Sequence, residues 1–427
     1  MSIAWRRVTR RIAIQAMLAH EWWRSGVTYN PLSPQVYSNP YPKYAELREK
    51  DPVHWSPLMD AWVFSRYEDI DTILRDHQRF SSDARSRSPS RSRRASIPSG
   101  NDPSMLFLDP PDHTRLRALV SKAFTPQAIE ALEPRIRQIM GELLDQIPNP
   151  NGFDLIQAIA NPLPVIVIAE LLGVSPEDRA QFKHWSDQRA RLLEPTITTQ
   201  ERQAAAHAAE GLNAYFLAVI EQRRMQPRDD LISALVAVEE AGDKLTQHER
   251  LEMLRLILVA GNETTTNLIG NGILALLRHP QQMQRLRDEP GLIAAAVEEL
   301  LRYDAPVQIN ARSALQDIEI HGRSIKKGQG IILLIASANH DPTVFRNPEQ
   351  LDITRQETSH IAFGRGIHHC LGAPLARLEA RIVIDMLLER FANFRLLTDT
   401  PTFRDNLVLR GLTTLPIHTE ASPSRIP

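Results

Sequence analysis

The sequence predicts a mainly α-helical fold with a minor β part, and three observations support this prediction. Thirty prolines divide the 427 residues into many segments with helical periodicity. The longest of these, 248–278, is apolar nearly all round from Met253 to Leu277, which predicts a helix buried through the middle of the protein. The runs with strand character are few and short. With 42% hydrophobic residues, the chain can fill one large core.

Local patterns predict the other elements. Pro42 lies in the first turn of a predicted helix at 41–50, because proline is tolerated there. The runs 53–55 and 61–64 flank a turn-like stretch that begins at Pro57, which predicts a β-hairpin. Further helices are expected at 67–74, within 126–147, within 176–225, at 289–304 and at 375–390, and further short strands at 317–320, 331–335 and 413–417.

Residues 1–38 are expected to form an N-terminal extension with a short amphipathic helix, followed by a single domain at 39–427. Arginines at positions 6, 7, 10 and 11 precede the apolar run 12–19. A signal peptide would need a longer apolar region and a small-residue cleavage site, but His20-Glu21-Trp22-Trp23 follows instead. The pattern favours a helix that lies on the protein surface or touches a membrane.

The bulk properties exclude several classes of function. The formal net charge of −1 indicates no general attraction to nucleic acid. Five arginines between Arg85 and Arg94 stand among serines without aromatic residues, which favours a solvated loop over a nucleic-acid or phosphorylation site. No uncharged apolar run reaches about 18 residues, so we expect no spanning membrane helix. A single cysteine favours a reducing compartment, and we expect a cytoplasmic protein.

The single cysteine, Cys370, lies in a glycine-rich loop. One thiol can form neither an internal disulfide nor a multi-cysteine metal site. The glycines bend the backbone tightly around the sulfur, and Pro374 predicts that a helix begins just after Cys370. Free N–H groups and the dipole at a helix N-terminus favour a thiolate, whereas a small buried apolar cysteine fits this frame poorly. The loop reads Phe363-Gly364-Arg365-Gly366-Ile367-His368-His369-Cys370-Leu371-Gly372.

A compact polar stretch, Ala260-Gly261-Asn262-Glu263-Thr264-Thr265, interrupts the long apolar helix. The small Ala260 and Gly261 would let a ligand approach the backbone closely. Thr264 can donate a hydrogen bond to the Ala260 carbonyl one turn earlier. Glu263 and Thr264 together suit a proton relay, and the alternative is a buried polar patch whose neighbours satisfy it.

Two further pairs are weak signals by themselves. Glu299 and Arg302 lie three residues apart on a predicted helix, so they share a face and can form an ion pair. His113 and Arg117 lie four apart, and together they suit an anionic ligand such as a carboxylate.

The four signals are the cysteine loop, the polar stretch of the long helix and the two residue pairs. In this order and at these intervals, they together resemble the cytochrome P450 superfamily, the haem-thiolate monooxygenases, in its soluble bacterial class. The resemblance extends from about Asn39 to about Thr419. It implies the cytochrome P450 fold, with haem b (iron protoporphyrin IX) buried between the long central helix and the cysteine loop. Cys370 would be the thiolate ligand of the iron, framed by Phe363, Gly364 and Gly372.

The resemblance also implies roles for the other residues. Glu263 and Thr264 would be the acid–alcohol pair that delivers protons during O2 activation, with Ala260 and Gly261 beside the haem. Glu299 and Arg302 would form a structural network with Arg355. The haem carboxylates would be held by His113, Arg117, Arg312 and His368, with His368 preferred to His369 because it occupies the fixed position of the motif.

By the same resemblance, a substrate pocket over the haem would be walled by the 81–108 loop, the 180–205 region and apolar stretches of the chain. Such a lining suits a lipophilic small molecule. Glu194, Gln308 and Asn310 are candidate polar anchors, and ordinary solvated or capping roles are the alternative. The lining residues implied by the resemblance are Phe107, Val259, Val307, Ile309, Val408 and Leu409.

The implied reaction inserts one oxygen atom of O2 into the substrate, with electrons ultimately from NAD(P)H. No flavin or nicotinamide domain is recognisable, so we expect a separate ferredoxin or flavodoxin with its reductase. Two alternatives stay open: a peroxide-driven haem-thiolate peroxygenase, against which the intact acid–alcohol pair counts, and a non-catalytic haem-thiolate ligand-binding protein. The residues expected to form a basic docking surface for the electron donor are Arg115, Lys122, Arg365 and Arg377.

Overall fold

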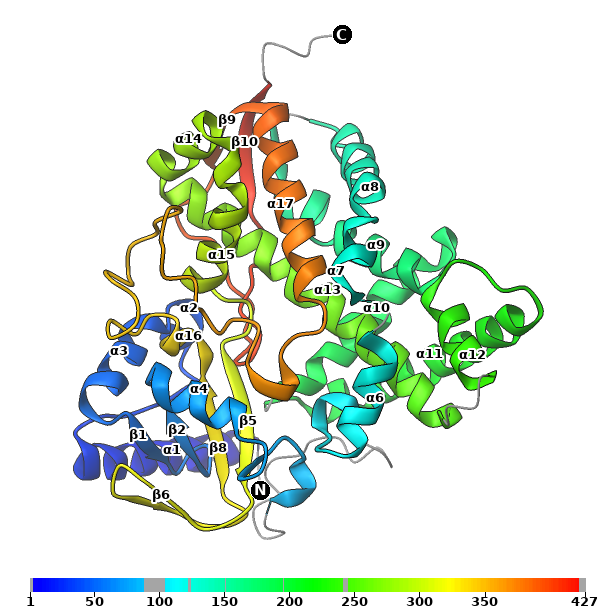
Figure 1. Cartoon of the computed structure of the whole chain (residues 1–427). Helices are drawn as coiled ribbons and strands as arrows, with labels where there is room; N and C mark the ends of the chain where they lie inside the picture. The colour runs from blue at the N-terminus through cyan, green and yellow to red at the C-terminus, as the bar shows by residue number, and fades with distance from the viewer. Residues whose placement is uncertain are drawn as a thin grey trace.

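The computed structural model describes residues 3–87, 104–121, 124–149, 151–194, 196–240 and 245–421, with only the backbone at 3–12, 238–240 and 421. Helices form most of the fold and strands the smaller part, as predicted (Figure 1). Most of the arginine- and serine-rich run, from residue 88 onward, and Lys122 lie outside the described residues.

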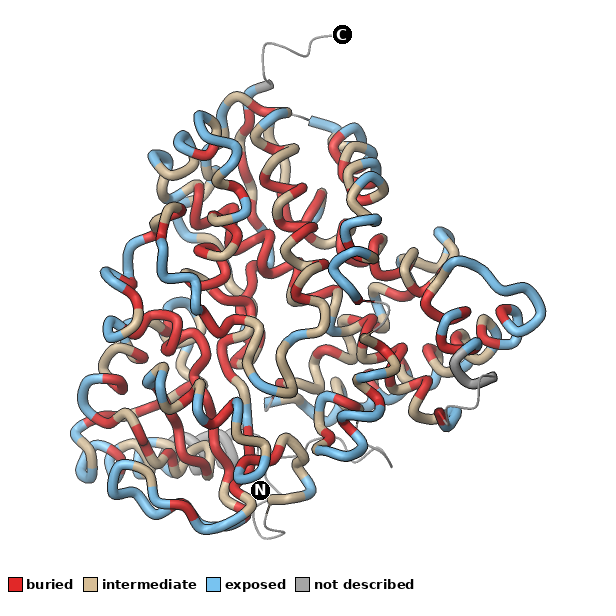
Figure 2. The backbone as a smooth tube through the Cα atoms, in the orientation of Figure 1, coloured by how far each residue is buried: buried red, intermediate tan, exposed pale blue. Residues whose placement is uncertain are grey.

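The predicted central helix is α13, Gln247–Arg278, which crosses the helical part of the molecule (Figure 1). It begins after Thr246, whose hydroxyl accepts a hydrogen bond from the Glu249 N–H while the Glu249 carboxylate accepts one from the Thr246 N–H. Most of its residues are buried (Figure 2). Because α13 is apolar on nearly all sides, it is surrounded by α9 Pro162–Leu172, α10 Arg179–Ala190, α11 Thr199–Met225, α15 Ile293–Tyr303 and α17 Ala373–Arg390.

Two predicted helical stretches are divided by local signals. The stretch 126–147 becomes two helices, because Pro134 starts a new first turn. The stretch 176–225 is divided before α11, where Thr198 and Glu201 form the same reciprocal cap as at α13. The remaining helices are α2 Pro34–Ser38, α3 Tyr41–Lys50, α4 Tyr67–Arg75, α6 Asp112–Ser121, α7 Pro126–Glu130, α8 Glu133–Asp145, α12 Leu231–Glu240, α14 Pro280–Asp288 and α16 Ile335–Ala338.

The largest sheet has the strand order β1-β2-β8-β5-β3. The predicted hairpin is confirmed as β1 Val53–Ser56 and β2 Ala61–Phe64, in antiparallel register. Strand β8, Gly330–Leu334, is buried throughout and pairs in parallel with β2 and antiparallel with β5, Ile309–Ala314. The other strands are β3 Phe80–Ser81, the three-stranded set β4 Gly152–Asp154, β10 Pro416–Ala421 and β9 Phe391–Leu396, and the pair β6 Ile318–Ile320 and β7 Arg323–Ile325.

A buried ion network joins α15 to the segment that leads into the cysteine loop. The Glu299 Oε2 accepts hydrogen bonds from the Nε atoms of Arg302 (2.7 Å) and Arg355 (3.0 Å). Its Oε1 accepts from Arg302 Nη2 (2.8 Å) and from the Asp352 N–H (2.9 Å). The other guanidinium N–H groups of both arginines bond backbone carbonyls between 339 and 350. The two arginines and the carboxylate therefore satisfy one another inside the protein.

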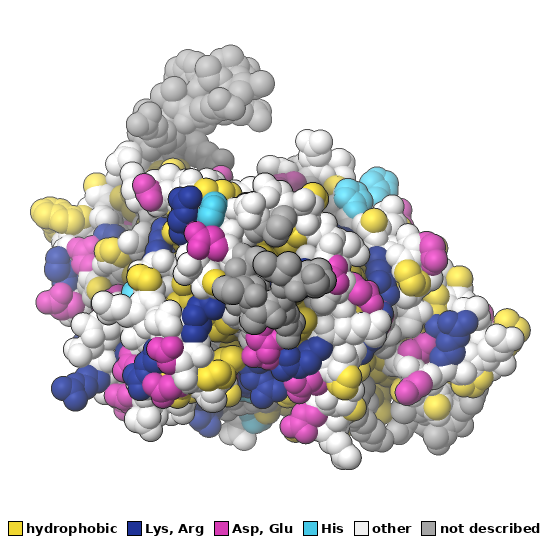
Figure 3. Space-filling view, turned by 90° about the horizontal axis from the view of Figure 1, so that it is seen from above, with side chains coloured by type: hydrophobic (Ala, Val, Ile, Leu, Met, Phe, Trp, Pro, Cys, Tyr) yellow, Lys and Arg dark blue, Asp and Glu magenta, His cyan; other side chains and the backbone are white. Residues whose placement is uncertain are grey.

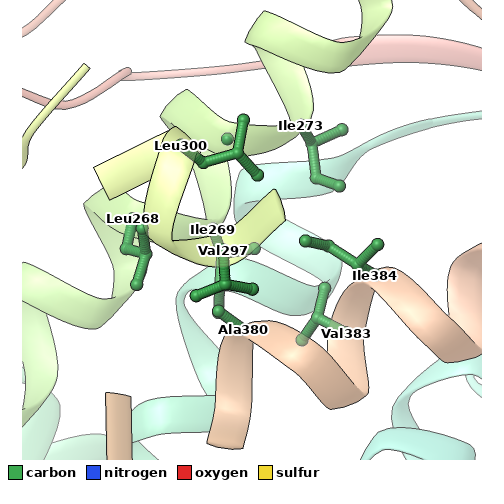
Figure 4. Close-up of a pocket in the computed structure, with 9 residues that line it drawn as sticks. Leu268, Ile269, Ile273, Val297, Leu300, Ala380, Val383 and Ile384 are labelled. Atoms are coloured by element: carbon green, nitrogen blue, oxygen red, sulfur yellow. The ribbon is translucent and has the colours of Figure 1, made fainter. Parts of the chain in front are cut away.

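A small cavity between α13, α15 and α17 is a packing feature (Figure 4). It encloses about 10 Å³, room for one water molecule at most, and its lining on α13 begins with Leu268, after the polar stretch 260–265 has ended. Its lining is wholly apolar: Leu268, Ile269, Gly272, Ile273, Val297, Leu300, Ala380, Val383 and Ile384. On the face shown in Figure 3, described acidic and basic side chains are interspersed, in keeping with a net charge near zero.

The N-terminal helix α1, Ile3–Ser25, is longer than expected and is attached to the sheet by its C-terminal end. The buried Glu21 carboxylate accepts hydrogen bonds from the Tyr29 N–H (2.8 Å) and from Ser56 Oγ on β1 (3.0 Å). His54 lies beside it, with its Nε2 at 3.7 Å from Glu21 and its Nδ1 at 3.0 Å from Asp51. None of the helices within the described residues is long and apolar enough to cross a membrane.

Raising the pH from about 5.5 to about 8 is expected to loosen the attached end of α1. Burial lowers the pKa of His54, but the carboxylates of Asp51 and Glu21 outweigh it, so the net shift is upward. A histidine whose pKa is raised in the folded state stabilises that state fully at pH values below its ordinary pKa of 6.5. This stabilisation is lost as the pH rises through the folded-state pKa. Amide hydrogen exchange at residues 14–25, corrected for intrinsic rates, should therefore accelerate.

The matched control is His54→Gln, which keeps a side-chain donor for Asp51 but does not titrate. In this variant the pH step in exchange at the end of α1 should disappear. An equal step in both proteins would show that another group causes it.

Candidate active site

The cysteine loop folds as a tight turn that ends at α17. Gly364 and Gly366 have φ angles of 69° and 65°, in the left-handed region that favours glycine. A Cβ on Gly366 would lie 2.5 Å from the carbonyl oxygen of Leu74 in α4. The Cys370 N–H donates to the Phe363 carbonyl (2.9 Å), and α17 begins three residues later at Ala373. The predicted position of Cys370 just before a helix is confirmed.

Two opposing effects act on the Cys370 thiol. Its side chain is accessible to solvent, yet enough protein surrounds the sulfur that burial raises the pKa of the thiol. These observations agree if the sulfur lies within a concave site. The N–H groups of Gly372 and Ala373 and the charges of Arg117 and Arg377 act to lower the pKa, but burial outweighs them and the net shift is upward. They stabilise the thiolate form, which is the form that ligates a metal.

Three nitrogen atoms of predicted ligand-binding residues are buried without a hydrogen-bond partner in the described part of the chain: His113 Nδ1, Arg312 Nη2 and His368 Nε2. The rings of His113 and His368 lie 4.1 Å apart. Burial and the charges of Arg312, His113 and Arg117 lower the pKa of His368 to about 3. Burial also lowers the pKa of Arg312 to about 10. The cluster is thus a buried set of hydrogen-bond donors of the kind that binds an anionic group.

Arg117 connects this cluster to the cysteine loop. Its Nη2 donates to the carbonyl of His369 (2.6 Å), the residue before the cysteine. Of the two adjacent histidines, His368 is the one whose ring contacts His113, and it is also the one that the motif position favours for a haem carboxylate. A ligand that carries carboxylates and presents a metal to the thiolate would satisfy all of these groups, and haem b is such a ligand. Cys370 would hold its iron, and His113, Arg117, Arg312 and His368 would hold its carboxylates.

One stretch of α13 is accessible although the helix on either side is buried. Val259 and Thr264 are half-buried and Ala260 is exposed. The Thr264 hydroxyl donates to the Ala260 carbonyl (2.7 Å), as predicted. Gly261 behaves differently from the prediction: a Cβ there would lie 3.1 Å from Ile168 of α9. Its small size therefore serves helix packing, and Ala260 is the small residue on the accessible face.

Glu263 has a partner that the sequence analysis missed. Arg404 Nη1 lies 3.1 Å from Glu263 Oε1. Burial raises the pKa of Glu263, and Asp187 adds to this, whereas Arg404 and Lys183 act against it. A separation of 141 residues hides this pair from any helical pattern, so no sequence signal could have found it.

The predicted lining residues come from four segments. Val307 and Leu409 pair as an isolated β-bridge, and the Gln308 N–H donates to the Val408 carbonyl (2.9 Å). Ile309 begins β5, and Phe107 lies in a short helical turn, Met105–Phe107, that contacts α13.

The predicted polar anchors bond within the protein. Glu194 accepts a hydrogen bond from the Leu407 N–H (2.6 Å). Asn310 Oδ1 accepts from Arg312 (2.7 Å), and Gln308 donates to the Ala305 carbonyl (2.7 Å). Glu194 therefore supports the 406–409 turn, which favours a structural role over the alternative of a ligand anchor.

Each described residue of the predicted basic docking surface has an acidic partner. Arg115 pairs with Glu249, Arg365 with Asp71 (3.3 Å) and Arg377 with Glu298 (2.6 Å). The described members of the set are therefore ion pairs rather than free positive charges. The Arg377 guanidinium also lies 4.6 Å from the centre of the Phe363 ring, so it covers the loop around the cysteine.

The family model for cytochrome P450 matches residues 41–416. The chain belongs to the cytochrome P450 family. It is 42% identical to the vitamin D(3) 25-hydroxylase of Pseudonocardia autotrophica over 89% of this chain and 94% of that protein. It is also 42% identical to the solved structure of PksS, a polyketide-synthase cytochrome P450 of Bacillus subtilis, with a TM-score of 0.85 over 92% of this chain and 100% of that one.

A cytochrome P450 of Bacillus megaterium, solved in complex with testosterone, is a third match. It is 37% identical, with a TM-score of 0.81, and the match covers 90% of this chain and 99% of that chain. The chain described in the present structure is therefore a haem monooxygenase that uses O2, and it has the fold of its bacterial relatives. The predicted family, fold class and enzyme class are confirmed.

Proposed function

We propose that this cytochrome P450 inserts one oxygen atom of O2 into a lipophilic small molecule. The electrons come from a separate ferredoxin or flavodoxin with its reductase, ultimately from NAD(P)H, and the setting is the cytoplasm. The observation that carries the proposal is the acid–alcohol pair on the accessible stretch of α13, where the Thr264 hydroxyl bonds the Ala260 carbonyl and the Glu263 carboxylate lies beside it in the sequence.

Glu263 and Thr264 divide the work of proton delivery. Burial raises the pKa of Glu263, so this carboxyl exchanges its proton closer to neutral pH than an exposed glutamate does. The Thr264 hydroxyl already donates to a backbone oxygen and can turn to donate to an oxygen atom in the accessible space. Arg404 holds the Glu263 carboxylate in place and limits the rise of its pKa. Bound haem with a thiolate ligand supplies the chemistry that activates O2.

The lining supports a lipophilic substrate. Phe107, Val259, Val307, Ile309, Val408 and Leu409 are all apolar, and the candidate anchors Glu194 and Asn310 already bond within the protein. When an apolar molecule binds against such a wall, apolar surface is removed from water, which favours binding. The names of the relatives fit this class, since they include a hydroxylase of vitamin D(3) and a protein solved with testosterone.

Two measurements test the proposal. Titration of the ferric protein with a panel of steroids, terpenoids, fatty acids and polyketides should give substrate-type spectral shifts with at least one lipophilic class. Turnover of that compound with isotopically labelled O2, redox partners and NAD(P)H should place one labelled oxygen atom in the product. Equal turnover with hydrogen peroxide alone would instead favour the peroxygenase alternative.

Thr264→Ala is expected to uncouple the reaction while leaving haem binding unchanged. Without the hydroxyl, proton delivery is misdirected and peroxide is released in place of product. The rate of product formation should fall by roughly 10²-fold, the lower end of what a positioned proton donor contributes. Product and hydrogen peroxide formed per NAD(P)H consumed are the measured quantities.

Thr266→Ala is the matched control, because this buried hydroxyl two residues along α13 donates to the Ala160 carbonyl (2.8 Å) instead. Its product yield per NAD(P)H should stay near that of the unaltered enzyme. If Thr264→Ala couples as well as Thr266→Ala, the assignment of Thr264 to proton delivery is wrong.

A further inference from the structure

Helix α1 lies before the segment that the family model matches, which begins at residue 41. Its C-terminal end is nevertheless held firmly, through Glu21, by Tyr29 and by Ser56 of β1. The monooxygenase site uses none of its residues. A helix that is fixed to the fold in this way presents a defined face to its surroundings.

The described side chains of α1 divide into two faces. Met17, Leu18 and Ser25 are half-buried on the side of the buried Glu21. On the other side, Ala16, Ala19, Trp22 and Trp23 are exposed. Trp22 is 64% exposed and Trp23 78% exposed, and they are two of the five exposed large apolar side chains among the described residues. Adjacent exposed tryptophans are unusual on a surface that meets water alone.

Apolar residues recur along the whole sequence of α1 at a spacing that places them on one helix face. Residues 5, 8, 12, 16, 19 and 23 follow one another at spacings of three and four, so they share one face of an α-helix. The six residues at these positions are Trp5, Val8, Ile12, Ala16, Ala19 and Trp23. Ala16, Ala19 and Trp23, the members with described side chains, are all exposed.

Helix α1 has a net positive charge. The helix carries Arg6, Arg7, Arg10, Arg11 and Arg24, and its one carboxylate is Glu21, which is buried. The whole chain has a net charge of −1, whereas α1 has five arginines against one glutamate and is therefore locally positive. An apolar stripe with tryptophans at both ends and arginines on the rest of the helix matches a bilayer surface with anionic headgroups.

We propose that α1 binds the surface of an anionic lipid bilayer, with its stripe at the level of the headgroups and the rest of the enzyme outside the bilayer. Tryptophan rings favour this interface because they are apolar with one polar N–H, and arginine side chains reach phosphates from a helix lying in its plane. A protein groove is the poorer match, because the small Ala16 and Ala19 leave the stripe without large side chains to insert between its ends.

The experiment is co-sedimentation of the full-length haem-loaded protein with vesicles. One set is pure phosphatidylcholine, and the other contains about one third phosphatidylglycerol. Binding to the anionic vesicles should exceed binding to the neutral ones by 10-fold or more at low salt and should fall steeply at high salt. The fluorescence of the exposed tryptophans should shift to the blue only with the anionic vesicles.

Variants of α1 and one matched control give the proposal its sharpest test. Trp22→Ser combined with Trp23→Ser should abolish sedimentation, and each Arg→Gln change at positions 6, 7, 10 and 11 should weaken it by about 5-fold. The matched control is Met225→Ser, which removes a 78% exposed apolar side chain from the end of α11 and should change nothing. A normal haem spectrum in each variant shows that the fold is intact.

Several outcomes would overturn the proposal. These are equal binding to both vesicle types, no binding to either, or full binding by the double tryptophan variant. Association of the protein with itself, or with an acidic protein but not with vesicles, through Trp22 and Trp23 would assign the face to a protein interface instead.

Discussion

Cys370→Ser is expected to lose the red-shifted Soret band of the reduced carbon monoxide complex and to lose O2-dependent product formation. A serine hydroxyl does not ionise at neutral pH, so no anionic ligand would remain for the iron. The N–H groups of Gly372 and Ala373 and the charges of Arg117 and Arg377, which favour the thiolate, would then act on a neutral group. Product formation should fall to the background of free haem.

The control for this change is His369→Gln. His369 precedes the cysteine and contributes its backbone carbonyl, rather than its ring, to Arg117. The reduced carbon monoxide complex of the His369→Gln variant should keep the red-shifted band. A red-shifted band in Cys370→Ser at full haem content would mean that another residue ligates the iron.

Glu299→Ala is expected to have the largest effect on stability. The change would leave the guanidinium groups of Arg302 and Arg355 buried without a carboxylate, because both bond the same oxygen of Glu299. Breaking a buried pair by removing one partner typically costs about 3–5 kcal/mol. The free energy of unfolding in denaturant should fall by about that amount, and less haem should be incorporated, since the network holds the segment that leads into the cysteine loop.

Glu46→Gln is the comparison at the surface. Glu46 pairs with Lys43 and Lys50 on α3, where solvent screens the charges, so the change should cost no more than about 1 kcal/mol. Equal losses in the two variants would show that the Glu299 network is not the buried support described above.

The strongest predictions from sequence concern short stretches of chain. The cysteine loop could be predicted because Gly364 and Gly366 each adopt a backbone angle that favours glycine, and because Pro374 marks the first turn of α17. The bond from Thr264 to Ala260 follows from helix geometry alone. In each case the residues that determine the structure are neighbours in sequence.

Partners from distant segments could not be predicted. Arg404 meets Glu263 across 141 residues, and Gly261 is small because Ile168 of α9 packs against it. The sequence alone gave no sign that the arginines of the predicted basic surface have acidic partners. In the fold, Glu249 lies beside Arg115, Asp71 beside Arg365 and Glu298 beside Arg377. Charge in the sequence gives no information on pairing between elements.

By itself, the sequence determined the fold class, the tight cysteine loop before α17 and the bond from Thr264 to Ala260, because local patterns of proline, glycine and helix spacing indicate each of them. The tertiary structure alone decided which charges are neutralised, which small residues serve packing, and that α1 is attached to β1 through Glu21. The physical reason is that ion pairing and close packing depend on distances through space, and these are set only when segments far apart in the chain meet.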